Sequence, residues 1–247
     1  MKTIKVLSIV MASLLITACV GDKKSIDIEE ANDTTSFVNK DFKGNLIDYD
    51  ENMSACDRMS KADLAKLYDV TAEEIIWMDS ASNERMTSNS PTCNFRVMLG
   101  ENEFNYLIGG ITVKREIKKD EMMGEIAEAA GGGENWKEAW ALQKSISKSA
   151  EWVKGVGLAA MWKPNKRELI IKFEGYSLYV MAPGAAFNQE EKARNRDYKT
   201  IALEMARKAG FINYKLLTQV LYRKDIDSLK LIGKNLSRIT GITGESL

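Results

Sequence analysis

Apolar and polar positions change their period along the chain, and these changes mark out its elements. An apolar run from 6 to 16 follows two lysines and is too short to span a bilayer as a helix. From 20 to about 50 the chain is polar and acidic, with no sustained apolar period. Such composition is typical of a tether, so we expect a disordered linker over 19–52 and a folded domain over 53–210.

Strict alternation of apolar and polar residues predicts the strands. In 93–99, Cys93, Phe95, Val97 and Leu99 alternate with mostly polar neighbours, which indicates a half-buried strand. Between 104 and 117 the alternation changes parity at Gly109-Gly110, and one extra residue there would return the apolar positions to one face, so we predict a β-bulge. The other predicted strands are 75–78 and an antiparallel meander of 158–163, 169–173 and 177–181.

Helical spacing of apolar residues predicts the remaining elements. The predicted helices of the domain cover 60–68, 120–130, 134–147 and 188–209. Gly131 to Gly133 separate the second from the third, and Gly210 is the expected C-cap of the last. Beyond it, 211–247 carries two amphipathic stretches. The pattern therefore predicts an α+β fold, an antiparallel sheet with helices packed on it, plus a C-terminal helical extension.

The N-terminus has the form of an export signal. Residues 1–18 read as a signal peptide, and Leu15-Ile16-Thr17-Ala18-Cys19 resembles the lipobox of bacterial lipoproteins. We therefore expect cleavage before Cys19 and lipid on its sulfur and amine, with an ordinary secretory signal as the alternative. Val20 stands where an aspartate would suggest inner-membrane retention, so the outer membrane is favoured as the location.

Composition removes several classes of function. The chain has 35 basic and 35 acidic residues, so no overall field favours nucleic acid as a partner. It contains no histidine, which excludes Ser-His-Asp and Cys-His catalysis and histidine-ligated zinc. We expect no cofactor and no catalytic or metal residues.

Two cysteines remain once Cys19 is assigned to the lipid. Cys56 and Cys93 form an even pair, and in an oxidising compartment we predict a disulfide between them. The alternative is two free thiols, one of them reactive, but no Cys-x-x-Cys spacing supports redox chemistry.

Three short motifs have both a functional and an ordinary interpretation. Ser145 and Lys148 match Ser-x-x-Lys, but a solvated helix end is favoured because the companion elements are missing. The triplet Gly131 to Gly133 could cradle a phosphate, but an interhelical turn is favoured. Trp136 and Trp140 lie one helical turn apart, and they are either part of a buried aromatic core or candidate contacts with a partner.

The C-terminal tail is the least ordinary feature. Leu217 and Leu221 lie on an apolar stripe in a basic segment. The tail either closes over the sheet or forms a docking surface for an envelope protein or anionic lipid, and the first is favoured.

The landmarks occur in the order seen in a known family. Cys56 before a short helix, Cys93 opening a strand, Gly155-Val156-Gly157 ahead of Ala159-Ala160-Met161-Trp162, a hairpin and an alanine-rich helix together resemble small secreted bacterial lipoproteins of unknown function. The resemblance covers 53–210 and implies a PsbP-like α/β sandwich. Leu158 departs from it, since the family usually has an acidic residue there.

These observations favour a lipid-anchored protein of the bacterial cell envelope that acts as a non-catalytic binding or assembly module. The membrane, through the lipid on Cys19, and an envelope protein are the expected partners. The alternative is a histidine-free hydrolase that uses Ser/Lys or paired carboxylates.

Overall fold

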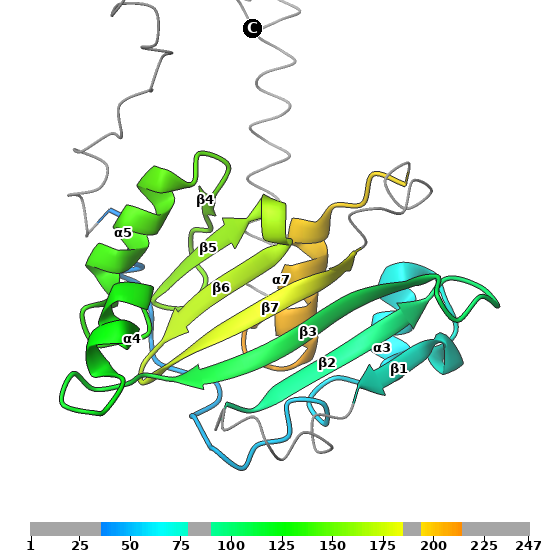
Figure 1. Ribbon diagram of the computed structural model, residues 1–247, viewed down its shortest axis with the longest axis horizontal. Coiled ribbons are helices and arrows are strands. Elements are labelled where there is room, and N and C mark those ends of the chain that lie inside the picture. The colour runs from blue at the N-terminus through cyan, green and yellow to red at the C-terminus, as the bar shows by residue number, and fades with distance from the viewer. Residues whose placement is uncertain (1–35, 79–89, 185–193, 214–247) are drawn as a thin grey trace, which may run out of the picture.

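The computed structural model describes residues 36–78, 90–184 and 194–213. Its centre is a seven-stranded antiparallel sheet with the strand order β1-β2-β3-β7-β6-β5-β4, which confirms the predicted α+β class (Figure 1). The strands are β1 (Ile75–Met78), β2 (Thr92–Met98), β3 (Tyr106–Arg115), β4 (Glu151–Trp152), β5 (Ala159–Lys163), β6 (Glu168–Phe173) and β7 (Tyr176–Gly184). The helices are α3 (Lys61–Tyr68), α4 (Gly124–Ala130), α5 (Trp136–Ile146) and α7 (Tyr198–Lys208). Two short 3₁₀ turns, Ala72–Glu74 and Pro164–Lys166, precede β1 and β6.

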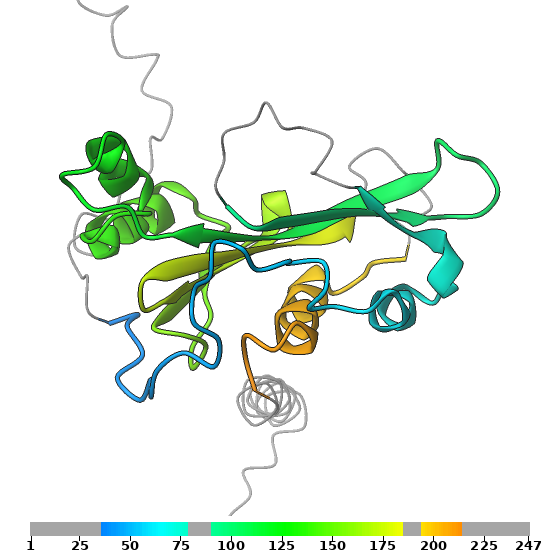
Figure 2. The ribbon, with the colours of Figure 1, turned by 90° about the horizontal axis from the view of Figure 1, so that it is seen from below.

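The two faces of the sheet are covered unequally. Seen edge-on, α3, α7 and the N-terminal segment lie on one face, while α4 and α5 lie on the other face at the end of the sheet near β4 (Figure 2). The burial pattern agrees: β5 and β6 are buried on both faces, whereas in β2 buried and half-buried residues alternate. A strand buried on both faces reads as a continuous apolar run, and one buried on a single face alternates.

The main core lies between the sheet and α3 and α7. Helix α3 begins as predicted, because the Ser60 hydroxyl accepts a hydrogen bond from the backbone N–H of Asp63. Helix α7 contributes buried side chains such as Leu203 and Met205. Phe211 and Ile212 follow it and are buried as well, so the first residues of the predicted C-terminal extension belong to the core. The rest of that extension lies outside the described residues.

The predicted linker is wrong in its C-terminal half. Residues 36–52 pack on the domain as an ordered segment, which we call the strap. Asn39 donates a side-chain hydrogen bond to the carbonyl of Gly157 (3.0 Å), and the hydroxyl of Tyr176 donates one to the carbonyl of Ile47 (2.6 Å). The strap therefore binds the domain through both a polar side chain and its backbone, so its polar composition does not make it a solvated linker. Residues 19–35 lie outside the described part.

A second strap contact spans a large sequence separation. The amide of Asn45 donates to the carbonyl of Glu174 and accepts from its backbone N–H, both at 3.0 Å. The partner is the β6–β7 turn at Glu174-Gly175, whose glycine has a φ of 76°.

The irregularity predicted at Gly109-Gly110 exists, but its form differs. Between Ile108 and Gly110 the register of β3 against β7 shifts, and the extra residue lies in β7. The parity of β3 is therefore kept, so Tyr106 and Ile108 do not join Ile111 on the core face. A Cβ on Gly109 would lie 2.5 Å from the ring of Pro183, which explains why glycine is needed there.

Both ends of helix α7 differ from the sequence prediction. Helix α7 begins at Tyr198, where the Asp197 carboxylate accepts from the backbone N–H of Thr200, and residues 194–197 are not helical. The predicted start at 188 lies outside the described residues. At the other end Ala209 is the C-cap, and Gly210 follows it with a φ of 84°. The two-residue strand β4 was not predicted.

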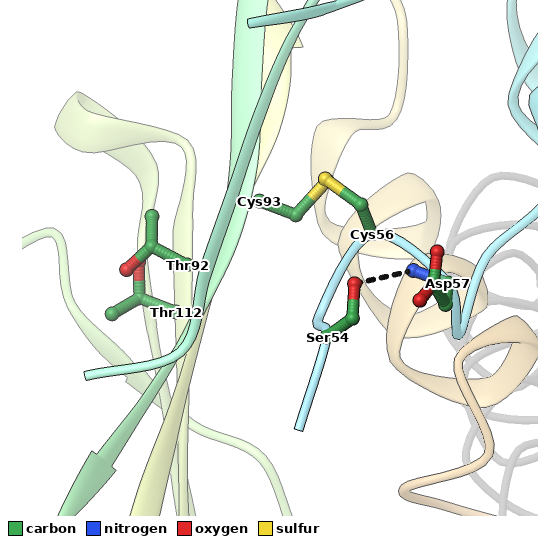
Figure 3. Close-up of a disulfide and its surroundings, with 6 residues drawn as sticks. All are labelled: Ser54, Cys56, Asp57, Thr92, Cys93 and Thr112. Carbon is green, nitrogen blue, oxygen red and sulfur yellow. Dashed lines mark hydrogen bonds between the residues drawn. A yellow bond between two sulfur atoms is a disulfide. The ribbon is translucent and has the colours of Figure 1, made fainter. Parts of the chain in front are cut away.

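The disulfide between Cys56 and Cys93 is present, as predicted (Figure 3). It joins the chain just before α3 to the start of β2, across a sequence separation of 37 residues. Cys93 is 1% exposed, so the bond lies against the core. It fixes the C-terminal side of the strap to the sheet.

We predict that Cys56→Ala/Cys93→Ala lowers the free energy of unfolding by about 3–4 kcal/mol, because closing a loop of this length restricts the unfolded chain. Urea unfolding of the oxidised wild type and the double variant measures the difference. Reduction of the wild type should shift its midpoint in the same direction. Equal midpoints for oxidised, reduced and variant protein would contradict the prediction.

An ion pair joins the two helices of the core layer. Lys208 Nζ lies 2.6 Å from Asp63 Oδ1, and this hydrogen bond, with a second from Ser60, lowers the pKa of Asp63. An aspartate with a lowered pKa stabilises the fold above its unfolded pKa of about 3.9, and that contribution is lost as the pH falls through the folded pKa.

We therefore expect Asp63→Asn to destabilise the protein at pH 7 by about 0.5–1 kcal/mol. The difference from wild type should shrink as the pH falls below about 4. Denaturant unfolding at a series of pH values measures it, with Asp57→Asn, a change at an exposed position nearby, as the control. A difference independent of pH would be inconsistent with the ion pair as its cause.

Candidate functional site

The two tryptophans proposed as partner contacts belong to the core. Trp136 and Trp140 are 5% and 1% exposed, and their rings meet edge-on with centroids 5.2 Å apart. The indole N–H of Trp140 donates to the carbonyl of Gly131 (3.1 Å). Neither side chain is available to a partner, so the buried interpretation holds. The other sequence candidates, Cys19, Leu217 and Leu221, lie outside the described residues.

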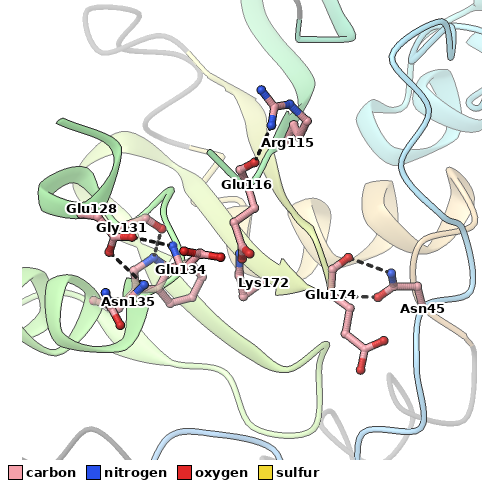
Figure 4. A network of polar contacts seen from close by, with 10 residues as sticks. Asn45, Arg115, Glu116, Glu128, Gly131, Glu134, Asn135, Lys172 and Glu174 are labelled. Carbon is pink, nitrogen blue, oxygen red and sulfur yellow. Dashed lines mark hydrogen bonds and ion pairs between the residues drawn. The ribbon is translucent and has the colours of Figure 1, made fainter. Parts of the chain in front are cut away.

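Gly131 to Gly133 form an interhelical turn, and a carboxylate of the same chain occupies the backbone amides that follow it. The carboxylate of Glu128 accepts hydrogen bonds from the backbone N–H groups of Glu134 and Asn135, both at 2.8 Å (Figure 4). A Cβ on Gly133 would lie 2.5 Å from this carboxyl group, and one on Gly131 the same distance from the Trp140 ring. The amides that could hold a phosphate at the start of α5 are therefore occupied from within the chain.

The Ser-x-x-Lys match does not form a dyad. The hydroxyl of Ser145 donates to the carbonyl of Leu142 at 2.8 Å, and α5 ends at Ile146. Lys148 thus lies beyond the helix rather than one turn along it. This agrees with the solvated helix end that the sequence favoured.

A buried lysine was missed by sequence reasoning. Lys172 of β6 is 1% exposed, forms an ion pair with Glu116, and has its ammonium 5.8 Å from the centroid of the Trp136 ring (Figure 4). The sequence does indicate this burial. Lys172 lies on the same face of the strand as Ile170, and nearly all other residues of the strand are apolar. Lys172 is thus one half of a buried ion pair whose other member, Glu116, reaches the edge of the domain.

Among the described residues, the best candidate for a functional surface is the second face of β2, β3 and β7. No described helix packs over its central part (Figure 2). We call it the polar face, and its half-buried or exposed side chains include Asn94, Arg96, Tyr106, Thr112, Lys114 and Tyr179, with the apolar Met98, Ile108 and Met181 among them. Strand alternation places them on the side opposite the core residues Phe95, Val113 and Val180.

Cation–aromatic pairs dominate the polar face. The guanidinium carbon of Arg96 lies 4.4 Å from the ring centroid of Tyr106, and the ammonium of Lys114 lies 4.7 Å from that of Tyr179. Each pair bridges neighbouring strands. Because the ring faces are covered by the chain's own cations, the rings are not free to stack on a ligand on that side. The cations instead offer donors that suit carboxylate, phosphate or carbonyl oxygens.

Burial shifts the pKa values of Tyr179 and Lys163, which lie where the polar face meets α5. Burial, followed by the charge of Glu168, raises the pKa of Tyr179, so its phenol stays protonated at neutral pH. Burial also lowers the pKa of Lys163, with Glu168 opposing the change. The ammonium of Lys163 donates to the side-chain oxygen of Gln143 on α5 at 2.9 Å. Tyr179 and Lys163 thus both offer hydrogen-bond donors where the polar face meets α5.

Comparison with known protein families, curated proteins and solved structures finds no match to this chain. Within the described ranges, no helix is long and apolar enough to cross a membrane. The same part of the chain holds no group of three or more metal-ligating residues placed around one point.

We predict that Glu116→Gln lowers the free energy of unfolding by about 3 kcal/mol, because it leaves the buried ammonium of Lys172 without a counter-charge. Lys172→Met should cost less, since Glu116 is 25% exposed and reaches water. Denaturant unfolding of both variants and of the double variant tests this. The double variant should be more stable than Glu116→Gln alone, and simple additivity would contradict the coupling.

Proposed function

We propose that this chain is an exported bacterial lipoprotein, anchored by lipid on Cys19, that acts as a non-catalytic binding or assembly module of the cell envelope. The observation that carries the proposal is the disulfide, which pairs two of the three cysteines. Cys19 is then the one cysteine left, and it stands at the end of the lipobox-like sequence.

The disulfide also supports the compartment. Disulfides persist in oxidising surroundings such as the periplasm or the cell exterior and are rare in the cytosol. The resemblance to small secreted lipoproteins points the same way. With Val20 after the cysteine, we propose the outer membrane rather than the inner one as the site of anchoring.

Binding is favoured over hydrolysis by the ionisable groups of the described residues. A catalytic acid needs a raised pKa, but the two acidic groups with a resolved shift are lowered by cationic partners. The hydrogen bond from Arg115 lowers the pKa of Glu121 to about 2, and that from Lys208 lowers the pKa of Asp63. Both are structural ion pairs. The polar face, with Arg96 and Lys114, is the surface on which we place the binding function.

The lipid anchor is tested by Cys19→Ser in the full-length precursor. We expect the wild type to enter the detergent phase on partitioning and to carry a lipid mass on its N-terminal residue, and the variant to stay in the aqueous phase. The Cys56→Ala/Cys93→Ala variant is the matched control, because it removes cysteines but keeps the anchor. Aqueous-phase partitioning of the wild type would refute the proposal.

A further inference from the structure

Exposed large apolar side chains gather on the two-helix segment formed by α4 and α5. Of the nine large hydrophobic residues exposed in the described part of the chain, five lie between 122 and 146. We call these five the hairpin surface: Met122, Met123, Ile126, Leu142 and Ile146. Single exposed apolar residues are ordinary, but a concentration on one segment marks an interaction surface.

The fold holds these side chains outward. Leu142 and Ile146 lie one turn apart on α5, on the flank away from the buried Trp136 and Trp140. The turn between the helices is fixed by the Glu128 carboxylate and by a hydrogen bond from the Gln143 amide to the carbonyl of Ala130 (3.1 Å). With the indoles filling the inner side, the exposed residues have no place in the core to which they could turn.

The strap enters the domain at this segment. Phe37 stacks on Trp152 with ring centroids 4.0 Å apart and meets Trp136 of α5 edge-on at 6.1 Å. Figure 1 shows the start of the described chain beside α5, at the opposite end of the molecule from the β2–β3 loop. An attachment N-terminal to the strap would therefore hold the α4–α5 end of the domain.

Chain length limits the distance between this end and the proposed anchor. Sixteen residues, 20–35, lie between Cys19 and Ser36. Even a fully extended chain of sixteen residues spans at most about 50–60 Å. A lipid on Cys19 would therefore keep the hairpin surface close to the bilayer at a high effective concentration, so weak contacts suffice.

The charge around the hairpin surface indicates whether contact with a membrane would depend on anionic lipids. Residues 118–148 carry five lysines and six acidic residues. This near balance gives no strong attraction to anionic head groups and no strong repulsion from them. Contact with lipid would therefore depend on the apolar side chains, as in interfacial helices that insert one face between head groups.

We propose that the hairpin surface rests on a phospholipid bilayer and orients the domain with its α4–α5 end toward the membrane. The proposal rests on the proposed lipid anchor for its geometry, but the contact itself does not need the lipid. The β2–β3 loop then points away from the bilayer.

The test separates the surface from the anchor by using the mature chain with Cys19→Ser. Flotation with phosphatidylcholine vesicles measures its binding. Leu142→Ser/Ile146→Ser should weaken binding about ten-fold or more, since each apolar side chain that enters the interface contributes on the order of 1 kcal/mol. The matched control is Ile76→Ser/Phe104→Ser, which removes two exposed apolar residues on β1 and the β2–β3 loop and should bind like its parent.

Each outcome decides the proposal. Equal binding by the two double variants, no binding by the parent, or binding only to anionic vesicles would overturn it. A change in oligomeric state on Leu142→Ser/Ile146→Ser without a change in flotation would assign the surface to a second copy of the chain instead. Melting temperatures should match, because the substituted residues are exposed. Detergent partitioning of the lipidated protein tests the anchor separately.

Discussion

The burial of both faces of β5 and β6 is the constraint on which the other features depend. One face is covered by the core layer of α3 and α7, so the second needs its own cover, which α4 and α5 supply. Lys172 points into that second layer, and Glu116 together with the Trp136 ring makes its burial tolerable. Because the cover ends at α5, the same face of β2, β3 and β7 keeps polar side chains.

The strap closes the structure from the N-terminal side. It begins at the aromatic contact of Phe37 with Trp152 and binds the β6–β7 turn through Asn45, and the disulfide at Cys56, just after the strap, joins the chain to β2. All three contacts are distant in sequence, so they tie together strands that local propensity alone would not bring into register. The disulfide stabilises this arrangement mainly by restricting the unfolded chain.

Much of the fold was predictable, because period-two alternation and helix caps are local signals. Ser60 caps α3 at the predicted start of that helix, and the disulfide followed from counting cysteines. The strap was missed because Asn39 and Asn45 make hydrogen bonds to residues more than a hundred positions away, and composition carries no record of such partners. The form of the bulge at Gly109-Gly110 was not predictable from β3 alone, because the extra residue lies in its partner strand β7.

The candidate surfaces were less predictable than the fold. The polar face arises from three strands that meet only through the antiparallel pairing of β3 with both β2 and β7. Arg96 and Tyr106 are ten positions apart, and Lys114 and Tyr179 are separated by a whole two-helix segment, so neither pair has a sequence signature. Their strands carried the correct alternation, but alternation identifies a face without identifying its neighbours.

The proposed anchor and the two surfaces are linked through the geometry of the sheet. The start of the strap and the hairpin surface share one end of the molecule, and the polar face extends from that end along β3 and β7 (Figures 1 and 2). A domain held at the α4–α5 end would carry Arg96, near the β2–β3 loop, farther from the bilayer than Lys114. Arg96 and Lys114 would then meet a ligand approaching from the aqueous side, where their positive charge is screened by salt but not neutralised. If the proposed anchor and the polar face both function as inferred, the geometry of the sheet would separate the anchored end from the binding groups.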